Sequence, residues 1–212
     1  MVRDLVMASA IAYILGSIPF GLVLVRLFRG IDVRQTGSGN IGTANVARVA
    51  PALGLWTLVL DSAKGYAGVA IAAVIASHSS SAASEPRNIA MIVGASALFA
   101  VLGHMFSLFL KGKGGKGVAT AMGAFLAMTP WAVLGAAVIY LLIYLLSHYT
   151  SLASIISAAL FPFLSAAFIA PGERPVLLPF VFMVCLLIIV KHHQNIRRLL
   201  TGTENRLDLK RR

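Results

Sequence analysis

The sequence predicts an all-α polytopic membrane protein with seven transmembrane segments, two of them short. Hydrophobic residues make up 58% of the 212 residues and charged residues only 12%, which is far more apolar than a soluble domain. Long apolar runs recur along the chain, and helices satisfy their own backbone polar groups inside lipid. Lysine and arginine gather in three segments, which decides the topology. We expect one integral-membrane domain over residues 1–212.

Five apolar runs are candidates for membrane helices, since a helix needs about 20 apolar residues to cross the hydrocarbon core. They are Leu5–Phe28, Pro51–Ala76, Ile89–Leu110, Leu152–Ala170 and Val176–Val190. The first run is too long for a signal peptide, and we expect it to remain in the mature protein.

A further run, from Val118 to Ser147, can form one long helix or two. Charge decides between them, because Lys and Arg in short loops collect on the cytoplasmic side. Fourteen of the eighteen Lys and Arg residues lie in three segments: Arg26, Arg29, Arg34 and Arg48; Lys111, Lys113 and Lys116; Lys191, Arg197, Arg198, Arg206, Lys210, Arg211 and Arg212. These segments share one side only if the run crosses twice, with a break near Thr129-Pro130, where proline can end one helix and open the next.

With seven crossings and the cationic segments inside, the N-terminus lies outside and the C-terminus inside. Residues 118–128 would be about 17 Å long as a helix, which is too short to cross without support from neighbouring protein. The three cationic segments then all face the cytoplasm.

The first inner segment reads DVRQTGSGNIGTANVARVA and contains one acid. Its glycines let backbone N–H groups turn toward an anion, and TANVARVA indicates a following helix whose N-terminus favours negative charge. Candidate donors are Ser38, Asn40, Thr43, Asn45 and Arg48. A flexible inner loop is the alternative interpretation.

The second inner segment, KGKGGKGVATAMG, again runs glycines into a short apolar helix. It is not a P-loop, because Gly117 follows Lys116 where that motif needs a hydroxyl for magnesium. Lys111 and Lys113 can be topogenic charge alone. We favour Lys116 as the phosphate ligand because it adjoins the short helix.

The third inner segment is KHHQNIRRLLTGTENR. If the last helix continues past Val190, His192 and Asn195 lie on one face near Arg198, which favours a functional role. Inside the second run, Asp61 and Lys64 are three residues apart and can pair on one helical face. Charge inside a membrane marks a pairing or a functional cavity, and we favour a supporting ion pair over direct ligand contact.

Three glycine-rich or cationic segments on one side of the membrane predict a receptor for phosphates. The chain has seven acids and no paired-carboxylate motif suited to magnesium, so we expect no metal and no cofactor. Hydrogen bonds to charged groups contribute about 1.5–3 kcal/mol each, so a few convergent donors suffice for a doubly charged ligand.

The motifs GSGNIGTANVAR, GHMFSLFLKGKGGKGVAT and HHQNIRRLLTGTENR, in this order, closely resemble those of the bacterial acyl-phosphate:glycerol-3-phosphate acyltransferase family. The resemblance covers essentially the whole chain, including LDSAKG in the second run. It implies transfer of a fatty acyl group from acyl phosphate to the 1-hydroxyl of glycerol 3-phosphate. The products would be lysophosphatidic acid and phosphate, in the first acylation of phospholipid biosynthesis. It also implies a seven-helix enzyme of the bacterial inner membrane.

The resemblance further implies residue roles. Glycerol 3-phosphate would be bound by Ser38, Arg48, Lys116, His192 and Asn195, of which Ser38, His192 and Asn195 are the candidate catalytic residues. The acyl phosphate would be bound by Gly39, Asn40, Gly42, Thr43, Asn45, Gly114, Gly115 and Gly117. Glu204 matches a family glutamate, and we group it with Asp61 and Lys64 as supporting residues. Lys113 adds a GK unit to the family's KGGKG, and this extra unit can change which lysine contacts the phosphate.

An acyl phosphate is already activated, so the protein needs to place the hydroxyl, stabilise the oxyanion and hold the departing phosphate. The resemblance favours a phosphate of the substrate as proton acceptor, with His192 second. A covalent role for Ser38 lacks an activating carboxylate–histidine pair nearby in the sequence. The fatty chain would lie in a groove between helices.

Two rival functions differ in recognisable ways. Acyltransferases that use acyl-CoA or acyl carrier protein place aspartate five residues after a histidine, and no histidine here has one. A transporter of phosphorylated metabolites should show paired half-helices in a repeat, and we find one break and no repeat. The net charge of +11 is explained by topology and anionic lipids rather than by nucleic acid. The expected partners are therefore the two substrates and membrane lipids.

Overall fold

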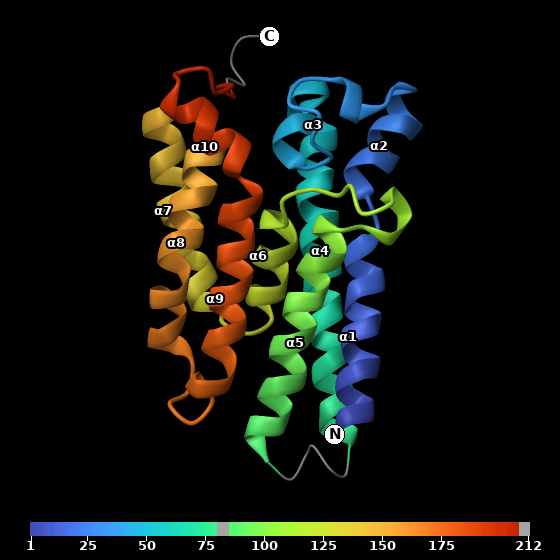
Figure 1. Ribbon diagram of the computed structural model, residues 1–212, viewed down its shortest axis with the longest axis vertical. Helices are drawn as coiled ribbons and strands as arrows, with labels where there is room; N and C mark the ends of the chain where they lie inside the picture. Colours follow the sequence, from blue (N-terminus) through green and yellow to red (C-terminus); the bar gives the residue numbers. More distant parts are fainter. Residues whose placement is uncertain (80–84, 208–212) are drawn as a thin grey trace.

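The computed structural model describes residues 1–79 and 85–207, and this part of the chain is helical without strands (Figure 1). Lys210, Arg211 and Arg212, counted above among the inner cations, lie outside the described residues. The α-helices are α1 Val2–Ser17, α2 Phe20–Arg29, α3 Thr43–Val49, α4 Pro51–His78, α5 Pro86–Met105, α6 Val118–Leu126, α7 Pro130–Ser147, α8 Thr150–Phe168, α9 Arg174–Lys191 and α10 His193–Leu200. Short 3₁₀ turns follow α2 at Val33–Gln35 and α5 at Leu108–Leu110.

Six helical segments of the described chain are long and apolar enough to cross a membrane. They are Val2–Arg29, Pro51–His78, Pro86–Leu110, Pro130–Ser147, Thr150–Phe168 and Arg174–Lys191. Between the third and fourth of these segments lies α6, whose nine residues extend only about 14 Å. The chain turns after α6 and begins α7 at Pro130, where the sequence predicts the break. The structure thus has six candidate spans and one half-length helix.

The helices form two groups, with α1, α4 and α5 in one, α7, α8 and α9 in the other, and α6 between them (Figure 1). Small residues let α6 lie directly against α4. A Cβ on Gly65 would overlap the carbonyl of Thr120, and one on Gly123 would overlap that of Ser62. Close backbone approach of this kind is how helices associate in lipid, where apolar contact alone gives little preference. It fixes the height of α6 in the bundle.

The first membrane segment is broken, whereas the sequence predicts one continuous run. α1 ends at Ser17 and α2 begins at Phe20, because Pro19 has no N–H to continue the ladder. Side chains from α4 and from the segment just after α5 satisfy the carbonyls at this break. Lys64 Nζ donates to the carbonyl of Ile18 at 2.6 Å, and Ser107 Oγ donates to that of Ser17 at 2.6 Å.

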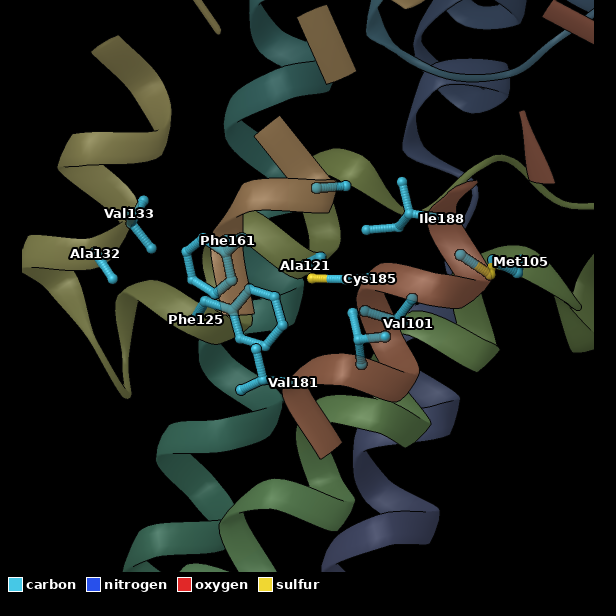
Figure 2. Close-up of a cluster of buried hydrophobic side chains, with 12 residues drawn as sticks. Val101, Met105, Ala121, Phe125, Ala132, Val133, Phe161, Val181, Cys185 and Ile188 are labelled. Atoms are coloured by element: carbon cyan, nitrogen blue, oxygen red, sulfur yellow. The ribbon is translucent and has the colours of Figure 1, made fainter. Parts of the chain in front are cut away.

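A buried apolar cluster joins α5 to α9 (Figure 2). Its members are Val101, Met105, Ala121, Phe125, Ala132, Val133, Ala158, Phe161, Val181, Val184, Cys185 and Ile188. The rings of Phe125 and Phe161 stack at its centre with centroids 4.5 Å apart. The N-terminus and α10 lie at opposite ends of the bundle (Figure 1).

Candidate active site

A cavity of about 370 Å³ extends from the loop after α2 down between α6, α7, α8 and α9. Polar residues line its mouth: Ser38, Asn40, Thr43, Arg48, Lys116 and His192. A smaller hollow of about 160 Å³ adjoins it. This hollow is lined by Ser38, Gly39, Asn40, Gly114, Lys116, Gln194, Asn195 and Arg198. The structure therefore brings together all three inner segments that the sequence singles out.

Asn45 organises the first loop. Its side chain is buried, and its Oδ1 accepts from the N–H of Ser38 at 2.8 Å. Its Nδ2 faces the carbonyls of Val33, Thr36 and Asn40 at 2.9–3.0 Å. The amide is thus fully used by the loop, so Asn45 shapes the site and presents Ser38 to it.

Two neighbours complete this loop. Asn40 Oδ1 accepts from the N–H of Gly42 at 2.8 Å, directly before α3 begins at Thr43. Thr43 lines the cavity mouth. Its Oγ1 is buried and has no hydrogen-bond partner among the described residues. Its hydroxyl is therefore a candidate donor to a ligand at the mouth.

The glycine-rich loop folds back over the end of α5. The N–H of Gly115 donates to the carbonyl of His104 at 3.0 Å, and that of Gly114 to Met105 at 3.2 Å. A Cβ on Gly115 would overlap the His104 ring, and one on Gly114 the His104 carbonyl. Glycine is therefore required here by close approach. Gly117, with φ +83°, then turns the chain into α6.

Only the last lysine of this loop reaches the site. Lys116 lines both the cavity and the smaller hollow, whereas Lys111 and Lys113 are exposed and line neither. Burial lowers the pKa of Lys116 to about 8; Glu204 opposes this shift, and Arg198 and Arg48 add to it. Phosphate would restore the charge balance around this lysine.

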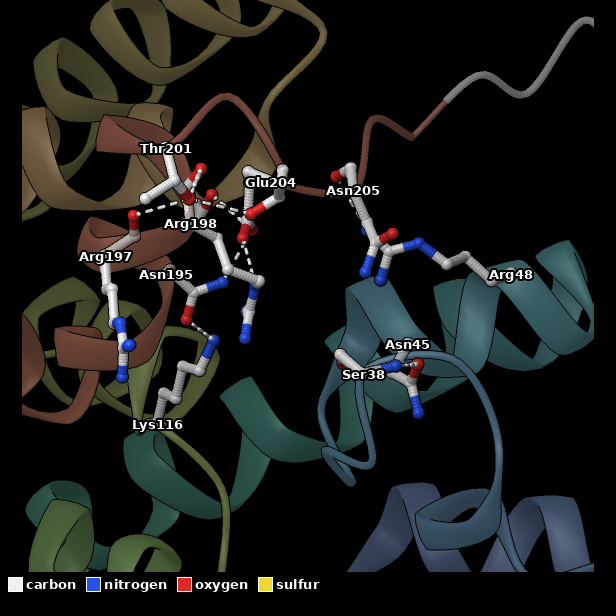
Figure 3. A network of polar contacts seen from close by, with 12 residues as sticks. Ser38, Asn45, Arg48, Lys116, Asn195, Arg197, Arg198, Thr201, Glu204 and Asn205 are labelled. Carbon is white, nitrogen blue, oxygen red and sulfur yellow. Dashed lines mark hydrogen bonds and ion pairs between the residues drawn. The ribbon is translucent and has the colours of Figure 1, made fainter.

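A continuous polar chain crosses the mouth of the site (Figure 3). Lys116 Nζ donates to Asn195 Oδ1, and Asn195 Nδ2 donates to Glu204 Oε1 at 2.6 Å. Glu204 also accepts from Ser151 Oγ at 2.8 Å and pairs with Arg198 Nε at 2.6 Å. Burial opposes ionisation of Glu204, but these hydrogen bonds hold its pKa below the ordinary value. Glu204 thus fixes Asn195 and Arg198 in place, consistent with a supporting role.

Arg48 approaches from the other side. Its Nη2 donates to the carbonyl of Asn205 at 3.2 Å, which ties α3 to the C-terminal segment (Figure 3). Burial lowers its pKa, partly opposed by Glu204. With Lys116 and Arg198, it surrounds the mouth with positive charge.

His192 is buried at the junction of α9 and α10. The last apolar run is expected to end at Val190, and α9 ends at Lys191, with α10 starting at His193. His192 Nδ1 lies 2.7 Å from the carbonyl of Ile188. A carbonyl only accepts, so Nδ1 carries the proton and Nε2 is left as an acceptor. Burial, reinforced by Lys116, lowers the pKa of His192 to about 4, so the imidazole is neutral near pH 7.

The predicted pair of Asp61 and Lys64 is formed below the mouth. Lys64 Nζ lies 2.7 Å from Asp61 Oδ1, and both side chains are buried. His104 Nδ1 lies 3.8 Å from the same oxygen. Asp61 and His104 line the cavity, whereas Lys64 turns to the carbonyl of Ile18. The pair therefore anchors the break in the first segment to α4.

Several residues of the site, among them Arg198, Ser151 and His104, were not assigned a role from the sequence. Arg198 was noted beside Asn195, and its helical spacing from Asn195 could have given it a role. Ser151 and His104 carry no local signal, because each acts through a contact across the bundle.

A family model described as glycerol-3-phosphate acyltransferase matches residues 6–202. The glycerol-3-phosphate acyltransferase of Geobacter sulfurreducens is 44% identical over 207 residues, covering 97% of this chain and 98% of that one. The Trichlorobacter lovleyi protein of the same name is 46% identical over 196 residues, covering 92% and 93%.

Two crystal structures of PlsY, described as an integral membrane glycerol 3-phosphate acyltransferase, share this fold at 37% identity. The glycerol 3-phosphate form has a TM-score of 0.83 and covers 96% of each chain. The lysophosphatidic acid form has a TM-score of 0.80 and covers 95% of this chain and 94% of that one. This chain belongs to the glycerol-3-phosphate acyltransferase family.

Proposed function

We propose that this protein transfers a fatty acyl group from acyl phosphate to the 1-hydroxyl of glycerol 3-phosphate. The products are lysophosphatidic acid and inorganic phosphate, and the reaction is the first acylation of phospholipid biosynthesis. The observation that carries this proposal is the form of the cavity, which joins a cationic mouth to an apolar interior between α6, α7, α8 and α9. The phosphates of the acceptor and of the acyl donor match the cationic mouth, and the donor's fatty chain matches the apolar interior.

The proposal includes a location. The protein lies in the bacterial inner membrane with its site facing the cytoplasm, the N-terminus outside and the C-terminus inside. This orientation counts α6 as a seventh, short segment, and membrane lipids surround the bundle. The clustering of cations at the end that carries the site supports it.

Glycerol 3-phosphate is assigned to the smaller hollow. Lys116 and Arg198 supply positive charge there, and Asn195 and Ser38 supply polar groups. Glu204 keeps Asn195 and Arg198 oriented before the substrate arrives, which lowers the ordering cost of binding. The neutral His192 then accepts a hydrogen bond from a glycerol hydroxyl at Nε2.

The donor's phosphate is assigned to the start of α6. The first N–H groups of a helix have no partner within that helix and favour an anion. Gly117, Val118 and Ala119 all line the cavity. The N–H groups of Gly114 and Gly115 are used within the protein, so these two glycines support the loop. Thr43 Oγ1 is a further donor to the phosphate or to the developing oxyanion.

The chemistry then requires no covalent intermediate. The glycerol oxygen attacks the acyl carbonyl carbon, and the bond from that carbon to the phosphate oxygen breaks. The hydroxyl proton passes to a substrate phosphate oxygen, because a pKa of about 4 makes His192 a weak base before substrate binds. Placement and electrostatic stabilisation carry the rate.

The test uses purified protein in lipid with glycerol 3-phosphate, a chelator and either acyl phosphate or acyl-CoA. We expect lysophosphatidic acid from acyl phosphate only. Product from acyl-CoA alone, or a requirement for magnesium, would refute the proposal.

A further inference from the structure

We propose that Phe125 and Phe161 form the floor of the acyl-chain cavity and set the chain length that the enzyme prefers. This inference rests on the proposed function, since it assigns the fatty chain to the apolar part of the cavity.

The cavity ends at one level on four different helices. Along α6 and α8, which descend from the mouth, the lining residues stop at Phe125 and Phe161. Along α7 and α9, which rise toward the mouth, the lining begins at Val133 and Cys185. All four residues are at most 8% exposed and belong to one buried cluster. The cavity therefore has a closed apolar floor.

Small side chains make up much of the walls above this floor, beside the larger Met122, Tyr140 and Ile188. Ala121 comes from α6, Ala136 and Ala137 from α7, and Ser154 and Ala158 from α8. They leave space for a polymethylene chain along the helices. The two rings stand where the lining residues of α6 and α8 stop, and they mark where the space ends.

The two rings are held firmly. Phe125 and Phe161 are 4% and 5% exposed and stack with an interplanar angle of 17° (Figure 2). Both belong to the same packed cluster as Val181 on α9, which does not line the cavity. Close packing prevents a ring from moving aside without opening a void. A chain that reaches the floor must stop, bend or leave into the lipid.

Helix geometry gives the depth. Phe125 is eight residues beyond Gly117, or about 12 Å along α6, and Phe161 is eleven residues beyond Thr150, or about 16 Å along α8. This depth is shorter than an extended long fatty chain. Long acyl chains would therefore reach the floor, so the floor can discriminate between donors of different length.

The test compares two cavity variants with a matched control. Phe161→Ala removes a floor ring. Ala158→Leu fills the space one turn above the same ring. Phe163→Ala is the control, because Phe163 lies on the same helix, is 67% exposed and does not line the cavity.

Each protein is assayed with saturated acyl phosphates from dodecanoyl to octadecanoyl, and kcat/KM is compared across the series. Relative to wild type, Phe161→Ala should raise the ratio of the longest to the shortest donor about tenfold, the order that a hydrophobic pocket gives for small changes in length. Ala158→Leu should lower that ratio, and Phe163→Ala should leave it unchanged.

The outcomes separate this inference from the proposed function. If wild type uses acyl phosphate but neither cavity variant changes the length profile, the floor assignment is wrong. If wild type makes no product from any acyl phosphate, the proposed function itself fails. If Phe161→Ala does not fold, Ala158→Leu decides the matter alone, since a profile equal to wild type would overturn the inference.

Discussion

Lys116→Ala should lower kcat/KM for glycerol 3-phosphate about a hundredfold. The change removes the ammonium that lines both parts of the site and leaves Asn195 Oδ1 without its donor. One hydrogen bond to a charged group contributes about 1.5–3 kcal/mol. Each 1.4 kcal/mol is about tenfold in rate, so this range corresponds to roughly 10- to 150-fold. Loss of the orientation of Asn195 places the expected value toward the upper end.

The same loop supplies the controls. Lys111→Ala and Lys113→Ala remove equal charge from exposed positions that line neither part of the site. Each should change kcat/KM about twofold or less, as surface substitutions within about 0.5 kcal/mol do. The assay is steady-state lysophosphatidic acid formation in lipid with varied glycerol 3-phosphate. The reasoning fails if Lys116→Ala is close to wild type, or if Lys113→Ala is as damaging.

Three further changes test the charge, the support and the packing of the site. Because the pKa of Lys116 is lowered to about 8 and its protonated form binds phosphate, kcat/KM for glycerol 3-phosphate should fall above about pH 8. Lys116→Arg should move that alkaline limb upward, since guanidinium stays charged; coincident limbs would contradict the assignment. Glu204→Gln removes the anion at the centre of the polar chain and should cost about 1.5–3 kcal/mol of stability, seen as a lower Tm in detergent. An unchanged Tm together with unchanged activity would argue against it. Gly115→Ala should reduce kcat/KM at least tenfold, because its Cβ would overlap the His104 ring and displace the loop, whereas Gly172→Ala meets open space and should be neutral; equal effects would show that the close approach is unimportant.

Two prolines show what the sequence could and could not predict about the fold. The break before Pro130 was predictable because the distribution of cations required an additional crossing in that apolar run. The break at Pro19 was missed because the surrounding residues stay apolar and no charge demanded a turn. Hydropathy reports the environment of a segment and does not report whether its backbone ladder is continuous.

The site shows the same division. Motif positions predicted that Ser38, Lys116 and Asn195 would converge, and they line one hollow. The support around them could not be read locally. Ser151 reaches Glu204 from α8, 53 residues earlier in the chain. Such pairings exist only once the helices have packed.

The position of the site follows from how the bundle satisfies its backbone in a low-dielectric environment. The break between α1 and α2 exposes carbonyls, which Lys64 and Ser107 satisfy. The end of α5 exposes further carbonyls, which the N–H groups of the glycine loop satisfy. The start of α6 exposes donors instead, and these lie on the cavity beside Lys116. The carbonyls named here, at the break between α1 and α2 and at the end of α5, are thus paired inside the protein. The N–H groups at the start of α6 instead face the cavity. An anionic substrate bound there, as proposed, would complete the hydrogen bonding that this short helix leaves open, which would explain why the chain keeps a segment too short to cross the membrane.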